Sequence, residues 1–195
     1  EHILLLVAKR QPAASDLRLV MSISKGVVDL ERIGDEAVKI ARMASKIAAE
    51  GNSAYGYAEV QHLSNQVRLM LNNSLEAFSQ SNAEQAFEVM RNDSVVNTEY
   101  QSAIRALMTY IMEDSRHVSK VINIMWILRS LERIGDHAQN VAELVINYIS
   151  GQDVRHSDYA MVEKAVQEAN DRLAARQVST LSANDLETSD SDEGC

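Results

Sequence analysis

The feature that most constrains the fold of this chain is a hexapeptide, LERIGD, that occurs twice among its 195 residues. It lies at Leu30–Asp35 and again at Leu131–Asp136. Each copy sits in a long stretch whose apolar residues recur with the period of an α-helix. Repetition of one helical phrase in similar surroundings predicts that the chain contains two related helical units.

The remaining sequence is also helical in pattern, because only one proline and seven glycines interrupt it. We expect a helix to end before Pro12. Further helices are expected over residues 16–50, 57–80, 83–113 and 119–150, with a short helix from Asp158 to about Arg176. These elements predict an all-α protein of two tandem three-helix bundles, of which the first is incomplete.

Three segments follow from this pattern. Residues 1–56 hold the remnant of the first unit, namely the end of one helix and the helix with the first LERIGD. Residues 57–156 hold the second unit as a complete three-helix bundle. Residues 157–195 hold a short helix and an acidic tail, which we expect to be disordered because it has few large apolar residues. Because the chain starts without methionine inside an apolar run, we expect its first helix to begin upstream.

Composition excludes several classes of function. The formal net charge is −9, so no basic surplus supports nucleic-acid binding. The single cysteine is the terminal Cys195, which fits a reducing cytosol and predicts no disulfide framework. No apolar run is long enough for direct membrane insertion, and we expect a cytoplasmic protein. Phosphate-binding loops, nucleophile elbows and dinucleotide-binding glycines are absent, so we do not expect an enzyme.

The acids of the repeated phrase fall in an unexpected place. The first copy spaces Glu31 and Asp35 four residues apart on one side of a helix. The second copy spaces Glu132 and Asp136 in the same way. On a helical projection both pairs lie within the apolar stripe, so we expect them to face a core. Arg32 and Arg133 are each about 100° away on the projection, but could still bridge these acids.

A third polar pair, Asp93 and Asn97, lies on the apolar stripe of the 83–113 helix, and Asn140 extends the second LERIGD copy by one further turn. Buried carboxylates cost several kcal/mol unless they are paired, protonated or bound to a cation. Oxygen ligands suit hard ions such as magnesium, manganese or iron. The pattern therefore indicates metal binding, while a metal-free helical scaffold with buried ion pairs remains an alternative.

The residues around these motifs resemble the PhoU family, the cytoplasmic accessory regulators of bacterial phosphate uptake. The similarity is carried by both LERIGD phrases and by residues 9–20, 107–115 and 151–156, and it covers about residues 1–156. The resemblance implies two three-helix bundles, which are often paired as a homodimer. It also implies acidic motifs that bind metal ions: iron or zinc clusters in some members, magnesium or manganese in others.

Carried over to this chain, the resemblance implies one metal cluster formed by Asp93, Asn97, Glu132 and Asp136, with Asn140 as a further ligand. It implies a second cluster that uses Glu31 and Asp35. Two departures bear on these sites. The family usually has an acid where this chain has Asn97, so that site loses one charge. The partner acids of the first cluster lie in helices that this chain lacks, so we expect that cluster to be half built and its helix face under-covered.

The function implied by the resemblance is that of a negative regulator. Such a protein would couple the ATPase of the phosphate ABC transporter to the membrane sensor histidine kinase, restrain uptake and keep the phosphate-starvation regulon silent. The competing hypothesis is a carboxylate-bridged metal enzyme in a helical bundle. Its Glu-x-x-His signature occurs once, from Glu59 to His62, whereas such sites use it twice.

Overall fold

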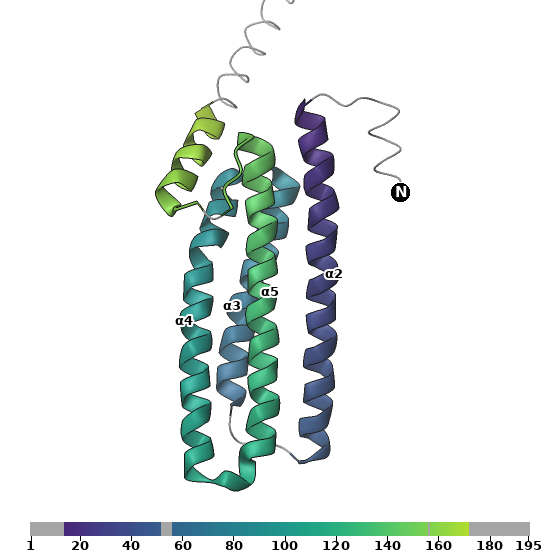
Figure 1. Ribbon diagram of the computed structural model, residues 1–195, viewed down its shortest axis with the longest axis vertical. Helices are drawn as coiled ribbons and strands as arrows, with labels where there is room; N and C mark the ends of the chain where they lie inside the picture. The colour runs from purple at the N-terminus through teal and green to yellow at the C-terminus, as the bar shows by residue number, and fades with distance from the viewer. Residues whose placement is uncertain (1–13, 52–55, 156, 172–195) are drawn as a thin grey trace, which may run out of the picture.

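The computed structural model describes residues 14–51, 56–155 and 157–171. These residues form α2 (Ala14–Ala49), α3 (Tyr57–Gln80), α4 (Ala83–Glu113), the 3-10 helix η1 (Ser115–His117) and α5 (Val118–Ser150) (Figure 1). A further helical segment covers residues 159–171. No strand occurs within these ranges, and the predicted all-α fold class is confirmed.

Helices α3, α4 and α5 pack against one another around one apolar core (Figure 1). Their inward positions recur every three to four residues, as expected for helices that bury one face. Leu63, Leu107 and Leu128, one from each helix, are at most 1% exposed. Asn82 caps α4 by accepting a hydrogen bond from a backbone N–H of the first turn, and Gly151 ends α5 with a φ of 78°.

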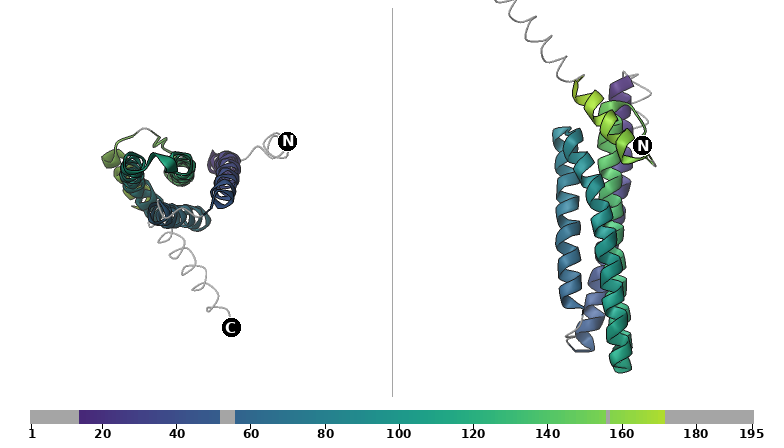
Figure 2. Two further views of the ribbon diagram at one scale, coloured as in Figure 1. Left: turned by 90° about the horizontal axis from the view of Figure 1, so that it is seen from below. Right: turned by 90° about the vertical axis from the view of Figure 1, so that its left-hand side faces the viewer.

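Helix α2 lies outside this three-helix bundle. Among the described elements it packs against α5 alone. The end-on view shows α2 at one side of the other helices (Figure 2). The face of α2 toward α5 contains Ser22, Asp29 and Glu36, which are buried, with Ile33 and Ile40 packed against the core. The two helices that carry the LERIGD phrases are therefore direct neighbours.

The opposite face of α2 is apolar and exposed. Leu17, Ile23, Val27 and Val38 are between 38% and 58% exposed. By helical spacing this is the stripe on which the sequence places the first pair of acids. The stripe was expected to be under-covered in this chain, and within the described ranges no element covers it.

The segment of residues 159–171 packs across the start of α4. The ring of Tyr159 meets Phe87 edge-on with centroids 6.4 Å apart, and its hydroxyl donates to the carbonyl oxygen of Met90 at 3.3 Å. Val162 and Ala165 are buried at this contact. The predicted short helix is thus present as far as it is described.

The predicted helices over residues 57–80 and 83–113 coincide with α3 and α4, and the other two long helices begin or end within two residues of the prediction. The predicted helix end before Pro12 and the predicted disordered tail lie outside the described residues. Within the described ranges, none of the helices combines the length and the apolar character that a membrane crossing requires.

Candidate metal centre

The structure brings together the predicted site residues of α4 and α5. Asp93 and Asn97 occupy successive turns of α4, and the amide Nδ2 of Asn97 donates to Asp93 Oδ2 at 2.8 Å. Glu132 and Asp136 occupy successive turns of α5, close enough for their charges to act on Asp93. Two helices that are antiparallel neighbours thus present three carboxylates and one amide to each other.

Glu132 is the most enclosed member of this group, with 8% of the residue exposed. Arg129, three residues earlier on α5, donates from Nη1 to Glu132 Oε1 at 2.6 Å. The other carboxylate oxygen, Oε2, is buried and has no hydrogen-bond partner among the described residues. A buried carboxylate oxygen without a partner is costly, so this atom is where a cation would be stabilised most.

The pKa directions show that the acids of this group oppose one another's ionisation. Burial raises the pKa of Asp93 to about 6, the charges of Asp136 and Glu143 add to this effect, and the hydrogen bond from Asn97 works against it. Burial likewise raises the pKa of Glu132, and the charge of Asp136 reinforces the increase. Partial desolvation also raises the pKa of Asp136, even though its outer edge reaches solvent. A bound cation would reverse each of these directions.

The residues present fit a hard metal ion by their chemistry. Glu132 Oε2, the carboxylates of Asp93 and Asp136, and the amide oxygen of Asn97 are all oxygen donors. In the conformation described, no three acidic, histidine or cysteine side chains within the described ranges are close enough to hold an ion together. Metal binding would require these side chains to draw together.

Asn140 lies apart from this group. Its Nδ2 donates to Asp29 Oδ1 on α2 at 3.0 Å. The expectation that Asn140 extends the second motif as a ligand is therefore not met in this conformation. The reason is that Asn140, one helical turn after Asp136, faces α2, whereas Glu132 and Asp136 lie near α4.

Glu31 and Asp35 are exposed on α2, so the expectation that they face a core is not met within the described chain. Their stripe is apolar, as the sequence indicates, but no described element covers it. The glycines of the two phrases show the same difference. A Cβ built on Gly135 would lie 3.3 Å from Val96, whereas one built on Gly34 would meet nothing within 4 Å.

Sequence reasoning missed a set of polar residues between α2 and α5. Glu36 Oε1 forms an ion pair with Arg133 Nη1 at 3.1 Å and accepts a hydrogen bond from Lys39 Nζ at 2.8 Å. Burial acts to raise the pKa of Glu36, but these cations and a hydrogen bond from Ser130 outweigh burial and lower it. Glu36 therefore stays ionised as an ion pair between the two LERIGD helices.

A second polar contact joins the same helices. His137 Nδ1 lies 2.9 Å from Asp29 Oδ1, which requires the proton to be on Nδ1, and both side chains are about 12–13% exposed. The signal for these contacts was present in the sequence, because Ser22, Gly26 and Asp29 recur at helical spacing on the face opposite Glu31. That face has small and polar residues instead of large apolar ones, so it does not stand out as a core stripe.

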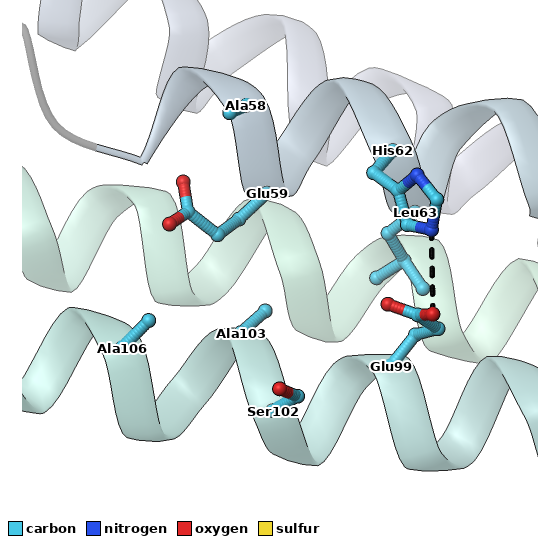
Figure 3. A pocket seen from close by; sticks show the side chains of 8 residues that line it. All are labelled: Ala58, Glu59, His62, Leu63, Glu99, Ser102, Ala103 and Ala106. Carbon is cyan, nitrogen blue, oxygen red and sulfur yellow. Dashed lines mark ion pairs between the residues drawn. The ribbon is translucent and has the colours of Figure 1, made fainter.

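The single Glu-x-x-His motif lies in an open pocket of about 440 Å³ between α3 and α4 (Figure 3). His62 Nε2 faces Glu99 Oε1 across the helices at 3.3 Å, and Tyr110 donates its hydroxyl to Glu59 Oε1 at 3.4 Å. The rest of the lining consists of Leu63 and the small residues Ala58, Ser102, Ala103 and Ala106. The second Glu-x-x-His pair that a carboxylate-bridged dimetal site needs does not occur in the sequence.

Comparisons with known proteins show which family this chain is similar to. The PhoU domain matches residues 1–44 and 60–145. The phosphate-specific transport system accessory protein PhoU homolog of Pseudomonas aeruginosa is 53% identical over 167 residues, which cover 86% of this chain and 69% of the relative. The Escherichia coli protein named phosphate-specific transport system accessory protein PhoU is 44% identical over 77% of this chain and 62% of its own length.

Solved structures agree with this assignment. The crystal structure of PhoU from Pseudomonas aeruginosa superposes with a TM-score of 0.75 at 55% identity, covering 77% of this chain and 72% of that chain. The structure of the phosphate transport system regulatory protein PhoU from Streptococcus pneumoniae gives a TM-score of 0.70 at 25% identity, over 78% and 71%. The chain spans about two thirds of the length of the curated relatives that it matches.

Proposed function

Because this chain belongs to the PhoU family, we propose that it acts without catalysis as an accessory protein of phosphate uptake. The observation that carries the proposal is the match of the PhoU domain over both LERIGD regions, together with 53% identity to a relative that is named an accessory protein of phosphate-specific transport. Such a name describes a role performed by contact with a transport system. The non-enzymatic expectation from the sequence agrees with that description.

The finer part of the proposal concerns regulation. The protein restrains the phosphate ABC transporter by contact with its ATPase and relays this state to the sensor histidine kinase, which keeps the phosphate-starvation regulon silent. It does so in the cytoplasm and as a homodimer. The exposed apolar face of α2, around Val27 and Val38, supports the assembly of this chain with another helical surface, because such a face is stabilised by burial.

Metal binding is the third part of the proposal. Glu132, Asp93 and Asp136 hold a metal ion between α4 and α5, with the amide oxygen of Asn97 as a neutral ligand. The orphaned Glu132 Oε2 supports this, because an ion would supply the partner that the atom lacks. Magnesium, manganese, iron or zinc would each serve to fix α4 against α5. Glu31 and Asp35 are assigned to a second ion that requires ligands from another helix.

A reporter of the phosphate-starvation regulon, such as alkaline phosphatase activity, tests the function. A strain that lacks the gene is grown in phosphate-rich medium and complemented with the wild-type chain, with an upstream-extended form, or with extended forms that carry substitutions. We expect deletion to turn the reporter on and the extended form to silence it. A reporter that stays silent after deletion would contradict the regulatory proposal.

The substitutions separate metal binding from the general role. Glu132→Gln with Asp136→Asn removes two charges of the proposed site and should prevent silencing. Glu88→Gln is the matched control, because Glu88 is an exposed acid on α4 that pairs with Arg91 at 3.3 Å. If both forms silence the reporter equally well, the site has no regulatory role.

A further inference from the structure

A second cleft, of about 280 Å³, opens between the two LERIGD helices and the segment that follows α5. Lys25, Arg32 and Asp29 line it from α2, Asn140 and Glu143 from α5, and Arg155 from the following segment. Its lining residues differ from those of the acidic group between α4 and α5, although the charge of Glu143 acts on Asp93. Among its lining residues, Asn140 was predicted as a metal ligand, and the proposed function does not use the cleft.

The cleft is richer in positive charge than the rest of the chain. Three cationic side chains line it against two carboxylates, whereas the whole chain has a net charge of −9. One of the carboxylates, Asp29, points its Oδ1 at His137 and Asn140, which lie at hydrogen-bond distance and stabilise its charge. The other, Glu143, accepts from Gln139 Nε2 at 3.0 Å.

The cations of the cleft differ in what they contact. Arg155 donates from Nε to Asp153 Oδ1 at 2.9 Å, so a large part of its charge is compensated there. Lys25 is exposed and close enough to help hold the pKa of Asp153 below its usual range, after the larger effect of Arg155. Arg32 forms no hydrogen bond or ion pair with another side chain of the described ranges. Arg32 is thus a cation at the cleft that forms no direct ion pair within the described ranges.

The repeat explains why Arg32 lacks a partner. Alignment of the two phrases makes Arg32 equivalent to Arg133, and Glu36 equivalent to His137. Arg133 of α5 pairs with Glu36 of α2 at 3.1 Å. The equivalent pairing on the other side would join Arg32 to His137, which is not an acid and instead contacts Asp29. Divergence of the two copies has therefore left one arginine of the pair without the equivalent ion-pair partner.

We propose that this cleft binds a phosphate-type tetrahedral oxyanion between α2 and α5. The guanidinium of Arg32 and the ammonium of Lys25 provide the charge, and a guanidinium presents paired N–H donors that match two oxygens of such an anion. Asn140 has a second amide hydrogen, beyond the one given to Asp29, that can be donated to the anion. The ligand is either inorganic phosphate or a small phosphate monoester, since the volume accommodates both.

Titration of the metal-free 195-residue chain with inorganic phosphate, at constant ionic strength, tests this proposal. Amide chemical shifts measured by NMR should change in a saturable way at Lys25, Arg32 and Arg155, and sodium chloride at equal ionic strength should not reproduce the change. Sulfate should compete at the same residues, because the proposal rests on oxyanion geometry. Glycerol phosphate serves as the monoester, and whichever of the two phosphates binds more tightly identifies the source of the ligand.

Substitutions test whether Arg32 itself binds the phosphate. Arg32→Gln should weaken phosphate binding about tenfold or more, as expected when one charge-assisted hydrogen-bonding partner is removed. Arg42→Gln is the matched control, since it removes the same charge from an exposed position of α2 outside the cleft lining. Equal loss in both variants, or shifts spread over the surface without saturation, would overturn the proposal. The wild-type shift map decides the matter even if a variant fails to fold.

Discussion

Asp93 offers the sharpest test of how the acidic group between α4 and α5 works. Burial and the charges of Asp136 and Glu143 raise its pKa to about 6, from an ordinary value of 3.8. A carboxyl whose pKa is raised by folding stabilises the folded chain while it is protonated. That contribution is fully present below pH 3.8 and is lost as the pH rises through about 6.

The size of the effect follows from the two pKa values. At 1.36 kcal/mol for each pH unit between them, ionised Asp93 lowers the free energy of unfolding by about 3 kcal/mol at neutral pH. Asp93→Asn keeps the shape of the side chain and removes the charge. In the metal-free chain we therefore expect the variant to be more stable than wild type by up to about 3 kcal/mol at pH 7.5, and equally stable near pH 4.

Urea unfolding followed by circular dichroism, in EDTA and at constant ionic strength from pH 4 to 7.5, measures this difference. The matched control is Glu88→Gln, an exposed acid of the same helix, which should change stability by less than about 0.5 kcal/mol. A variant that is less stable than wild type at pH 7.5 without metal, or that keeps the full wild-type pH dependence, would refute the reasoning.

Addition of metal should reverse the sign of the stability difference between wild type and Asp93→Asn. A cation bound by the carboxylates removes the repulsion that Asp93 otherwise adds, so manganese or magnesium should stabilise wild type. It should stabilise Asp93→Asn much less. Equal stabilisation of both proteins would show that the ion binds elsewhere.

Three further predictions follow from other contacts. Gly34→Ala should raise the free energy of unfolding by about 1 kcal/mol, because alanine favours the helix and nothing lies within 4 Å of the new Cβ. Gly135→Ala should gain less stability or lose some, because its Cβ would lie 3.3 Å from Val96. Urea unfolding of both variants measures the difference. Asp29→Ala should lower stability by about 1–3 kcal/mol in the same assay, because it leaves two half-buried donors without an acceptor. Val27→Glu should reduce self-association in light scattering without loss of stability, because Val27 is 58% exposed; self-association unchanged from wild type would exclude this face.

Much of the fold could be predicted because helix signals are local. The periodicity of apolar residues, the cap at Asn82 and the terminating Gly151 together define α3, α4 and α5. The contact between α2 and α5 could not be predicted in this way. It depends on small and polar residues such as Ser22, Gly26 and Asp29, whose meaning becomes clear only when a second helix lies beside them.

The sequence predicted which residues of α4 and α5 face each other, while metal binding by them stays a prediction. Asp93, Asn97, Glu132 and Asp136 come together because α4 and α5 are sequential and antiparallel. Asn140 was predicted as a metal ligand because it continues the four-residue spacing along one helix. That spacing does not reveal which neighbouring helix each successive turn contacts.

The first LERIGD copy shows a further limit of sequence reasoning. Its acids share an apolar stripe, which indicates a buried environment, yet Glu31 and Asp35 are exposed. Periodicity reports which face of a helix is apolar, but coverage of that face depends on other elements. The whole relatives are longer than this chain, and the stripe is uncovered within the described ranges.

The most direct test of the central claim is the metal content of the purified chain after dialysis, measured by elemental analysis for wild type and for Asp136→Asn. The account predicts that wild type retains metal in a fixed ratio to protein and that Asp136→Asn, folded to the same extent by circular dichroism, loses it. Retention of the same amount by both proteins, or by neither under mild conditions, would contradict a metal centre formed by Asp93, Glu132 and Asp136.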